Sequence, residues 1–350
     1  MITMCRRRKI YQEVMSVKEL IKEKFGIHIR DLTSYVSYQA FHTPNSMFLI
    51  VPVSHLSQDE LAELFSMSQY LQEQRDPYVS SFILTKDGEM TFEDNGVSYV
   101  LLQAAPRMTN RSVSFGAELA EFHQKGRGYP YEVKETSRIG QWKELWGKRL
   151  DQLEQFWIQK TQARQLQPFE KHFIESFPYY LGLTENAIQY LADTELDDQP
   201  QAADSGTICQ QRLTCEALRR EPLIKIPMEW VFDHAARDLA EYARSLFHER
   251  KNFNEIALFF QQYEQAAPLS SFSKRLVYSR LLFPLHYFET VEGYYISPES
   301  EHHYFESRLD HLLSQAPAYE QFLNGIQEMA GMTAAGLMSM PPVNWLKRTP

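Results

Sequence analysis

The stretch Thr207–Tyr242 constrains the fold more than any other part of this chain. It reads TICQQRLTCEALRREPLIKIPMEWVFDHAARDLAEY. An apolar start near Ile208 is followed by a polar loop and by a second short apolar run over residues 223–228. Asp233 then precedes a helical segment, where an aspartate side chain can bind the free backbone N–H groups of the first turn. This order predicts a strand at 223–228 paired with the strand near Ile208, followed directly by a helix.

The composition is that of a globular chain without an excess of basic residues. Of 350 residues, 43% are hydrophobic and 23% are charged, and the formal net charge is −9. Such a charge disfavours binding to nucleic acid or to an anionic membrane, which requires clusters of Lys and Arg. The short basic run 6–9 does not change this expectation. We therefore predict that neither nucleic acid nor a membrane is a partner.

No part of the sequence suggests export or membrane insertion. No run approaches the roughly 18 apolar residues that span a bilayer. No apolar segment follows the basic start, so we expect synthesis in the cytoplasm without a signal peptide. The three cysteines, Cys5, Cys209 and Cys215, form no C-x-x-C pair. We expect them to be free thiols that pack in the interior or have no chemical role, rather than parts of a disulfide framework.

The first hundred residues are expected to form mostly sheet, with two helices. Apolar residues at helical spacing predict helices over 17–25 and 58–75, and the continuous apolar run Met47–Val53 predicts a buried strand. Asp94-Asn95-Gly96 predicts a hairpin turn. We assign residues 1–106 to a small β-rich N-terminal lobe, because Pro106 closes this region.

Helix dominates from residue 112 onward. We assign residues 107–350 to a large helical C-terminal lobe that carries the loop 207–229, and we expect a surface loop over 196–206. The fold class is therefore α+β with two lobes. Helices are expected over 141–160, 170–177, 185–194, 235–250, 253–266 and 303–313.

The order of elements resembles that of the aminoglycoside phosphotransferase and choline kinase-like enzymes, which share a protein kinase-like fold. Those enzymes show a strand, a loop H-G-D-x-x-x-x-N, a strand ending I-D-[WF]-[EDG], and then D-P-x-x-D-L-A. Here Asp238-Leu239-Ala240 matches the last element, although Asp233 and Asp238 are one residue further apart than in the enzymes. The resemblance implies a two-lobed, aminoglycoside phosphotransferase-like fold.

The same alignment places residues without the required chemistry at every catalytic position. The loop histidine falls on Gln210, the catalytic aspartate on Arg212, and the metal-binding asparagine on Ala217. The metal-binding aspartate falls on Pro227, and the phosphate-binding lysine falls on Val51. Phosphoryl transfer needs oxygen ligands for Mg²⁺, a cation at the phosphates and a carboxylate near the acceptor hydroxyl. We therefore predict no catalytic residues, no cofactor and no metal.

The residues that remain near the loop are expected to serve the structure. Arg212 cannot accept a proton and should pair with an acidic neighbour. We expect Asp233 to cap the following helix and Asp238 to brace the loop, with Arg212 or loop N–H groups as its partners. Glu229 is the carboxylate left to bind a cation, although a polar group at a strand end explains it as well.

Two other constellations offer weaker chemistry. A metal could bind on one helix between His302, His303, Glu306 and His311, but such spacing is common by chance. A nucleophile pair of Cys209 with His234 has no further support in the sequence.

The combined pattern resembles the CotS/YutH group of bacterial spore coat-associated proteins, and within it the YutH members. The resemblance covers most of the chain and implies sporulation in an endospore-forming bacterium and association with the spore coat. It does not imply catalysis. It rests on Gly116-x-x-Leu119-Ala120-x-Phe122-His123, Trp142…Trp146-x-Lys148-Arg149-Leu150, Ile208-Cys209 and Trp230-Val231-Phe232-Asp233-His234-x-x-Arg237-Asp238-Leu239-Ala240-Glu241.

We therefore predict a pseudokinase that acts by binding spore coat or morphogenetic proteins. The alternative is an enzyme, either a small-molecule phosphotransferase or a nucleotidyl transferase, with a non-standard ligand set such as Glu229 and Asp233. A third possibility is a non-catalytic binder of a small ligand in the former acceptor cleft.

Overall fold

The structure is a computed structural model that describes residues 17–105, 114–250 and 253–329. Residue contacts divide the chain into two compact units. The first unit contains the chain through residue 108 together with residues 220–228, and the second contains 109–219 and everything from 229 onward. The boundary predicted at Pro106 lies outside the described residues.

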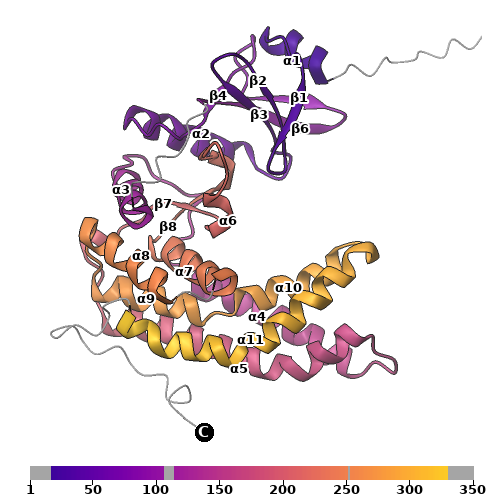
Figure 1. Ribbon diagram of the computed structural model, residues 1–350, viewed down its shortest axis with the longest axis vertical. Coiled ribbons are helices and arrows are strands. Elements are labelled where there is room, and N and C mark those ends of the chain that lie inside the picture. The colour runs from indigo at the N-terminus through magenta and orange to yellow at the C-terminus, as the bar shows by residue number, and fades with distance from the viewer. Residues whose placement is uncertain (1–16, 106–113, 251–252, 330–350) are drawn as a thin grey trace, which may run out of the picture. The chain divides into compact units, whose positions relative to one another are not determined.

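The first unit is built on an antiparallel sheet with strand order β1-β2-β3-β6-β4, in which β5 also pairs with β6 (Figure 1). Asn95 and Gly96 join β5 to β6 with φ angles of 51° and 79°, as a two-residue hairpin requires. Ser57 and Glu60 form a capping box at the start of α2. The elements are α1 (Val17–Phe25), β1 (Leu32–Tyr35), β2 (Tyr38–His42), β3 (Met47–Pro52), α2 (Gln58–Glu73), β4 (Ser81–Ile83), β5 (Thr91–Asp94) and β6 (Val97–Ala104).

Strand β3 is buried on both faces, which explains its continuous apolar sequence. Phe48 and Ile50 pack into one cluster with residues of α1. Leu49 and Val51 face the other side and pack into a second cluster. Because successive side chains of a strand point to opposite faces, a strand covered on both sides has no polar alternation. The buried strand predicted over Met47–Val53 is therefore present.

Residues 220–228 belong to the first unit, and this corrects the sequence analysis, which placed them in the C-terminal lobe and expected a strand at 223–228 paired with Ile208. The backbone of Lys225 instead bridges Val79 and bonds to Tyr78 and Ser80. The Lys225 ammonium lies 2.6 Å from the buried Asp76 carboxylate. Ile224 and two neighbouring apolar side chains complete the second cluster of the sheet. Burial of these side chains outweighs the expected hairpin pairing.

The second unit is mostly helical. Helix α11, yellow in Figure 1, packs against α5, α8, α9 and α10. The helices of the second unit are α3 (Phe115–Arg127), α4 (Trp142–Thr161), α5 (Pro168–Asp197), α6 (Cys215–Leu218), α7 (Ala236–Arg250), α8 (Phe253–Ala266), α9 (Ser271–Leu282), α10 (Leu285–Ile296) and α11 (His302–Met329), with 3₁₀ turns at Ala202–Asp204 and Glu299–Glu301. A further 3₁₀ turn, Pro227–Glu229, spans the point where the chain passes from the first unit to the second.

Two helical predictions need correction. The helices expected over 170–177 and 185–194 are one continuous helix, α5, which includes Pro178. The helix expected over 303–313 extends through Pro317 to Met329. A proline removes one intrahelical hydrogen bond, but packing of the flanking turns against the rest of the unit keeps the helix intact.

A small β-rich region followed by a large helical region confirms the predicted α+β class. None of the helices in the described ranges combines the length and apolar character that a bilayer crossing requires.

Candidate functional site

The loop that aligns with the catalytic loop of the phosphotransferases starts at the end of strand β7 (Thr207–Gln210). β7 pairs antiparallel with β8 (Trp230–Asp233), so that Thr207 lies opposite Asp233 and Gln210 opposite Trp230. The Gln211 N–H donates to the Glu229 carbonyl at 2.7 Å and closes this end of the ribbon. Both strands are short and largely buried. The ribbon therefore fixes the two ends of the loop in the second unit.

Asp238 holds the start of the loop, as a loop brace would. Its carboxylate accepts the Gln210 backbone N–H at 3.0 and 3.1 Å. It also lies 3.1 Å from Nε2 of His123, whose Nδ1 is 2.9 Å from the Tyr263 hydroxyl. Burial lowers the pKa of His123, more than the adjacent Asp238 raises it. These contacts, of which those of His123 are fully buried, tie β7, α3, α7 and α8 together.

Asp233 has a different set of contacts from the one predicted. Its carboxylate accepts the His234 backbone N–H at 2.8 Å, the Trp142 indole N–H at 2.8 Å and the Arg237 Nε–H at 2.6 Å. The first turn of α7 is capped instead by His234, whose Nδ1 accepts the Ala236 N–H at 3.0 Å. The helix-capping role therefore belongs to His234, and Asp233 joins α4 to β8 and α7.

Arg212, at the position of the catalytic base, is held between two carboxylates. Its guanidinium pairs with Glu241 of α7 and, at 2.9 Å, with Glu289 of α10. These are the acidic neighbours that the sequence analysis expected without identifying them. Burial would raise the pKa of Glu241, but Arg244, Arg212 and the neighbouring arginines lower it to about 2. Glu241 is thus ionised and shared among several cations.

The remaining predicted positions lack side-chain ligands for a cation. Ala217 lies in the short helix α6, whose first turn is capped by the Thr214 hydroxyl. Pro227 is buried and opens a 3₁₀ turn that ends at Glu229. Val51 is in the first unit, buried, and lies opposite Val100 in the sheet. Neither Ala217 nor Pro227 offers an oxygen to Mg²⁺ other than its backbone carbonyl.

The other predicted constellations are not assembled as active groups. Cys209 and Cys215 are both free and buried. The Cys209 thiol contacts the carbonyl of His234 rather than its imidazole, and burial raises the pKa of that thiol well above its usual range. A thiol in this state is a poor nucleophile.

The histidines of α11 are also separated from one another. His302 stacks on Tyr294 with ring centroids 4.1 Å apart, and the exposed His303 lies 3.8 Å from Glu306. His311 lies 2.6 Å from the Gln315 amide. Among the described residues, the side-chain ligand atoms of His123, Cys209 and Asp238 lie within 4.8 Å of one another. Because the imidazole and the carboxylate already bond to each other, this group is explained as a buried polar network.

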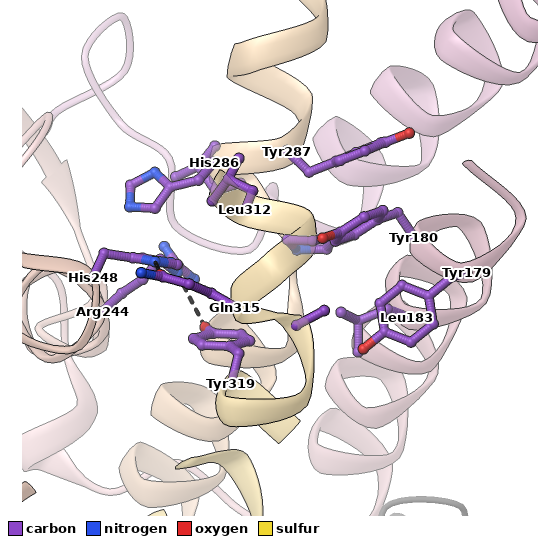
Figure 2. Close-up of a pocket in the computed structure, with 13 residues that line it drawn as sticks. Tyr179, Tyr180, Leu183, Arg244, His248, His286, Tyr287, Leu312, Gln315 and Tyr319 are labelled. Atoms are coloured by element: carbon purple, nitrogen blue, oxygen red, sulfur yellow. Dashed lines mark hydrogen bonds between the residues drawn. The ribbon is translucent and has the colours of Figure 1, made fainter. Parts of the chain in front are cut away.

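A small cavity is lined by Arg244 and His286, which pair with Glu241 and Glu289, and Figure 2 shows the side chains around it. His248 and His286 approach with ring centroids 4.7 Å apart, while Tyr180 stacks on Tyr287 at 3.7 Å. Arg244 contacts the Tyr319 hydroxyl at 3.4 Å. The volume is about 30 Å³, which suffices for about two water molecules. It is too small for a sugar or a nucleoside.

Sequence reasoning missed Glu241, Glu289 and Trp142 as partners of the loop region. Glu241 could have been found, because it follows Asp238 by three residues on the same face of a predicted helix. Glu289 could not, because it comes from a helix that the sequence analysis did not predict.

Known proteins share both the sequence and the fold. The endospore coat-associated protein YutH of Bacillus subtilis (strain 168) is 66% identical over 333 residues, which cover 94% of this chain and 98% of that protein. An aminoglycoside phosphotransferase from Alicyclobacillus acidocaldarius has a TM-score of 0.68 at 13% identity, covering 93% of this chain and 100% of its own. A spectinomycin phosphotransferase, APH(9)-Ia, has a TM-score of 0.58 at 13% identity, with 90% and 97% covered.

The two phosphotransferases establish the fold alone, and they confirm the kinase-like fold predicted from the order of elements. The family described as "Spore coat putative kinase YutH" matches residues 18–326. Together with the 66% identity to the Bacillus protein, this match shows that the chain belongs to the YutH family of spore coat proteins.

Proposed function

We propose that this protein is a catalytically inactive, kinase-like component of the spore coat that acts by binding coat or morphogenetic proteins. The observation that carries the proposal is the environment of Arg212. At the position where a phosphotransferase needs a carboxylate, a fixed cation is held by Glu241 and Glu289. A guanidinium accepts no proton, and both nearby carboxylates are occupied by ion pairs.

The spore coat enters the proposal through the relative. The Bacillus subtilis protein is described as endospore coat-associated, and it matches this chain over almost its whole length. We extend that association to this chain. A protein that keeps a kinase-like fold without the catalytic groups retains a large folded surface, and such a surface supports binding rather than turnover.

The enzyme alternative would use Glu229 and Asp233. The Asp233 carboxylate already accepts three N–H donors, including the Arg237 guanidinium. A divalent cation at Asp233 would have to displace Arg237, which lies 2.6 Å away. This competition favours the binding role.

Nucleotide binding gives the most direct test. Thermal unfolding would be followed with ATP and Mg²⁺, with ATP and EDTA, and without ligand. A ligand at about a hundredfold its dissociation constant stabilises a protein by about 2.7 kcal/mol. We expect the three melting curves to coincide. A rise in melting temperature that requires Mg²⁺ would overturn the claim of inactivity.

A second experiment separates the two roles in cells. Glu229→Gln, which removes the charge of one candidate ligand, would be expressed in a sporulating host that lacks its own copy. Glutamine keeps the size of the half-buried glutamate side chain and removes its charge. We expect the variant to appear in the coat fraction and to restore spore properties like the native protein. Normal coat association with lost spore function would instead support an enzyme.

A further inference from the structure

The second unit contains a larger cavity at the end of β7 and β8 that lies away from Arg212. Its volume is about 410 Å³, within the 300–1,000 Å³ typical of small-molecule sites. Gly206 and Asp233 border it at the Thr207 end of the strand pair. The loop with Arg212 leaves from the other end, beyond Gln210. The cavity is therefore separate from the former catalytic loop.

The walls of this cavity are largely apolar. Leu191 of α5 and Leu276 of α9 are buried and face it from two helices. Phe272, Ile139 and the Trp142 ring add aromatic and aliphatic surface. Ile139 is 41% exposed, so the apolar lining reaches solvent. Such walls favour an aromatic or aliphatic group of a ligand.

The ionisable side chains that line the cavity are three carboxylates and the imidazole of His234, with no lysine or arginine among them. Asp233 is neutralised by Arg237. Asp204 is buried, is bonded to the hydroxyls of Ser270 and Ser273, and lies 3.6 Å from Nε2 of His234. Burial would raise the pKa of Asp204, but the hydrogen bonds it accepts lower that pKa well below its usual range. The Asp204 carboxylate is therefore ionised at neutral pH and fixed in position.

Glu195 supplies the carboxylate that a ligand can reach. It lies on the last turns of α5, is exposed, and lines the cavity. Within the described residues we find no ion pair or hydrogen bond that uses its carboxylate. An exposed, uncommitted anion at the rim and a fixed buried anion in the wall together attract a positive charge.

We propose that this cavity binds a small amphipathic amine, with its apolar body between Leu191, Phe272 and Leu276 and its ammonium group at Glu195. The inference concerns a site apart from the loop around Arg212, and it holds whether or not the protein binds nucleotide. The apolar walls and the acidic groups of the cavity together define this class of ligand.

Three probes that share one apolar body test the charge requirement. Calorimetric titration of the full chain would compare 4-phenylbutylamine, 4-phenylbutanol and 4-phenylbutyrate. We expect the amine to bind best and the carboxylate worst. Equal affinities, tighter binding of the carboxylate, or no saturable binding of the amine below about 10 mM would overturn the proposal.

Two variants and a control locate the site. Glu195→Gln should weaken amine binding about two- to fivefold, the effect of removing one exposed charge partner. Glu185→Gln, an exposed glutamate ten residues earlier on α5, should leave binding unchanged. Ile139→Trp should block the cavity and abolish binding, and the partial exposure of Ile139 makes the larger ring tolerable. Binding that survives Ile139→Trp, or that responds equally to both glutamate changes, would place the probe elsewhere.

Discussion

Replacing Glu241 by glutamine should be among the most destabilising single changes in the second unit. Glu241 is 3% exposed, and its carboxylate forms ion pairs with Arg212, Arg244 and Arg280. Arg244 keeps two backbone carbonyl acceptors when that charge is removed. Arg280 keeps its position over the Trp142 ring, but its Nε already has no hydrogen-bond partner.

The expected cost follows from the buried cation that remains. Removing one partner of a buried ion pair costs about 3–5 kcal/mol. Burial and the nearby Arg237 already lower the pKa of Arg280 to about 10, although Glu241 raises it, so this cation depends strongly on Glu241. We expect Glu241→Gln to reduce the free energy of unfolding by about 3–5 kcal/mol. Adding Arg280→Met should recover at least about 1–2 kcal/mol, because an apolar chain of similar length needs no counter-charge.

Urea unfolding followed by tryptophan fluorescence suits this test. All five tryptophans come after residue 141, so the signal reports on the second unit rather than on the sheet of the first. The urea concentration at the midpoint should fall while the dependence of the unfolding free energy on urea concentration stays the same. This combination shows that the substitution changes stability. A cost below about 1 kcal/mol, or a double variant no more stable than Glu241→Gln, would refute the argument that Glu241 compensates buried arginines.

Two further outcomes follow from buried groups. Burial lowers the pKa of His248 to about 3 and also lowers that of His123. The unfolded chain therefore binds more protons at these sites below about pH 6.5. Their contribution to stability should be complete above that pH and should decrease as the pH falls, for His248 down to about pH 3. The slope of the free energy of unfolding against pH should reach up to about 1.4 kcal/mol per pH unit for each histidine. A free energy of unfolding that does not change with pH, or a pH dependence that His248→Gln leaves unchanged, would contradict the lowered pKa of these histidines. Gly126→Ala would bring a Cβ within 2.4 Å of a hydroxyl and 2.7 Å of a backbone nitrogen of β7, so we expect a loss of about 1–3 kcal/mol by urea unfolding. Gly182→Ala, where a Cβ meets nothing within 4 Å, should instead gain up to about 1 kcal/mol from helix propensity, and equal effects of the two substitutions would contradict the close approach at Gly126.

The elements that sequence reasoning predicted are those whose signal is local. The helix at Val17–Phe25, the buried strand from Met47 and the turn at Asp94–Gly96 each follow from neighbouring residues. Helix α9 was missed for a physical reason. Residues 273–282 are all buried, including Lys274 and Arg275, so no polar face marks the helical period.

The candidate site was predictable only in part. The position of Asp238 in the motif suggested a brace, and the structure shows its bonds to the loop backbone. The pairing of β8 was not predictable, because residues 223–228 and Trp230–Asp233 are both short apolar runs next to the same loop. The choice between them depends on burial of Ile224 and its neighbours against the sheet of the first unit, which is a long-range contact.

The ion pairs around Arg212 also explain why a single reversion should not create a kinase. Arg212→Asp would place a third carboxylate beside Glu241 and Glu289, and two unit charges 4 Å apart repel by about 4 kcal/mol at an effective dielectric constant of 20. The change would also remove one of the arginines that keep Glu241 ionised. We expect the variant to unfold more easily than the native protein and to show no Mg²⁺-dependent ATP binding, since Ala217 still offers no side-chain ligand. A stable Arg212→Asp variant that binds ATP would show that the loop is a suppressed active site rather than a structural element.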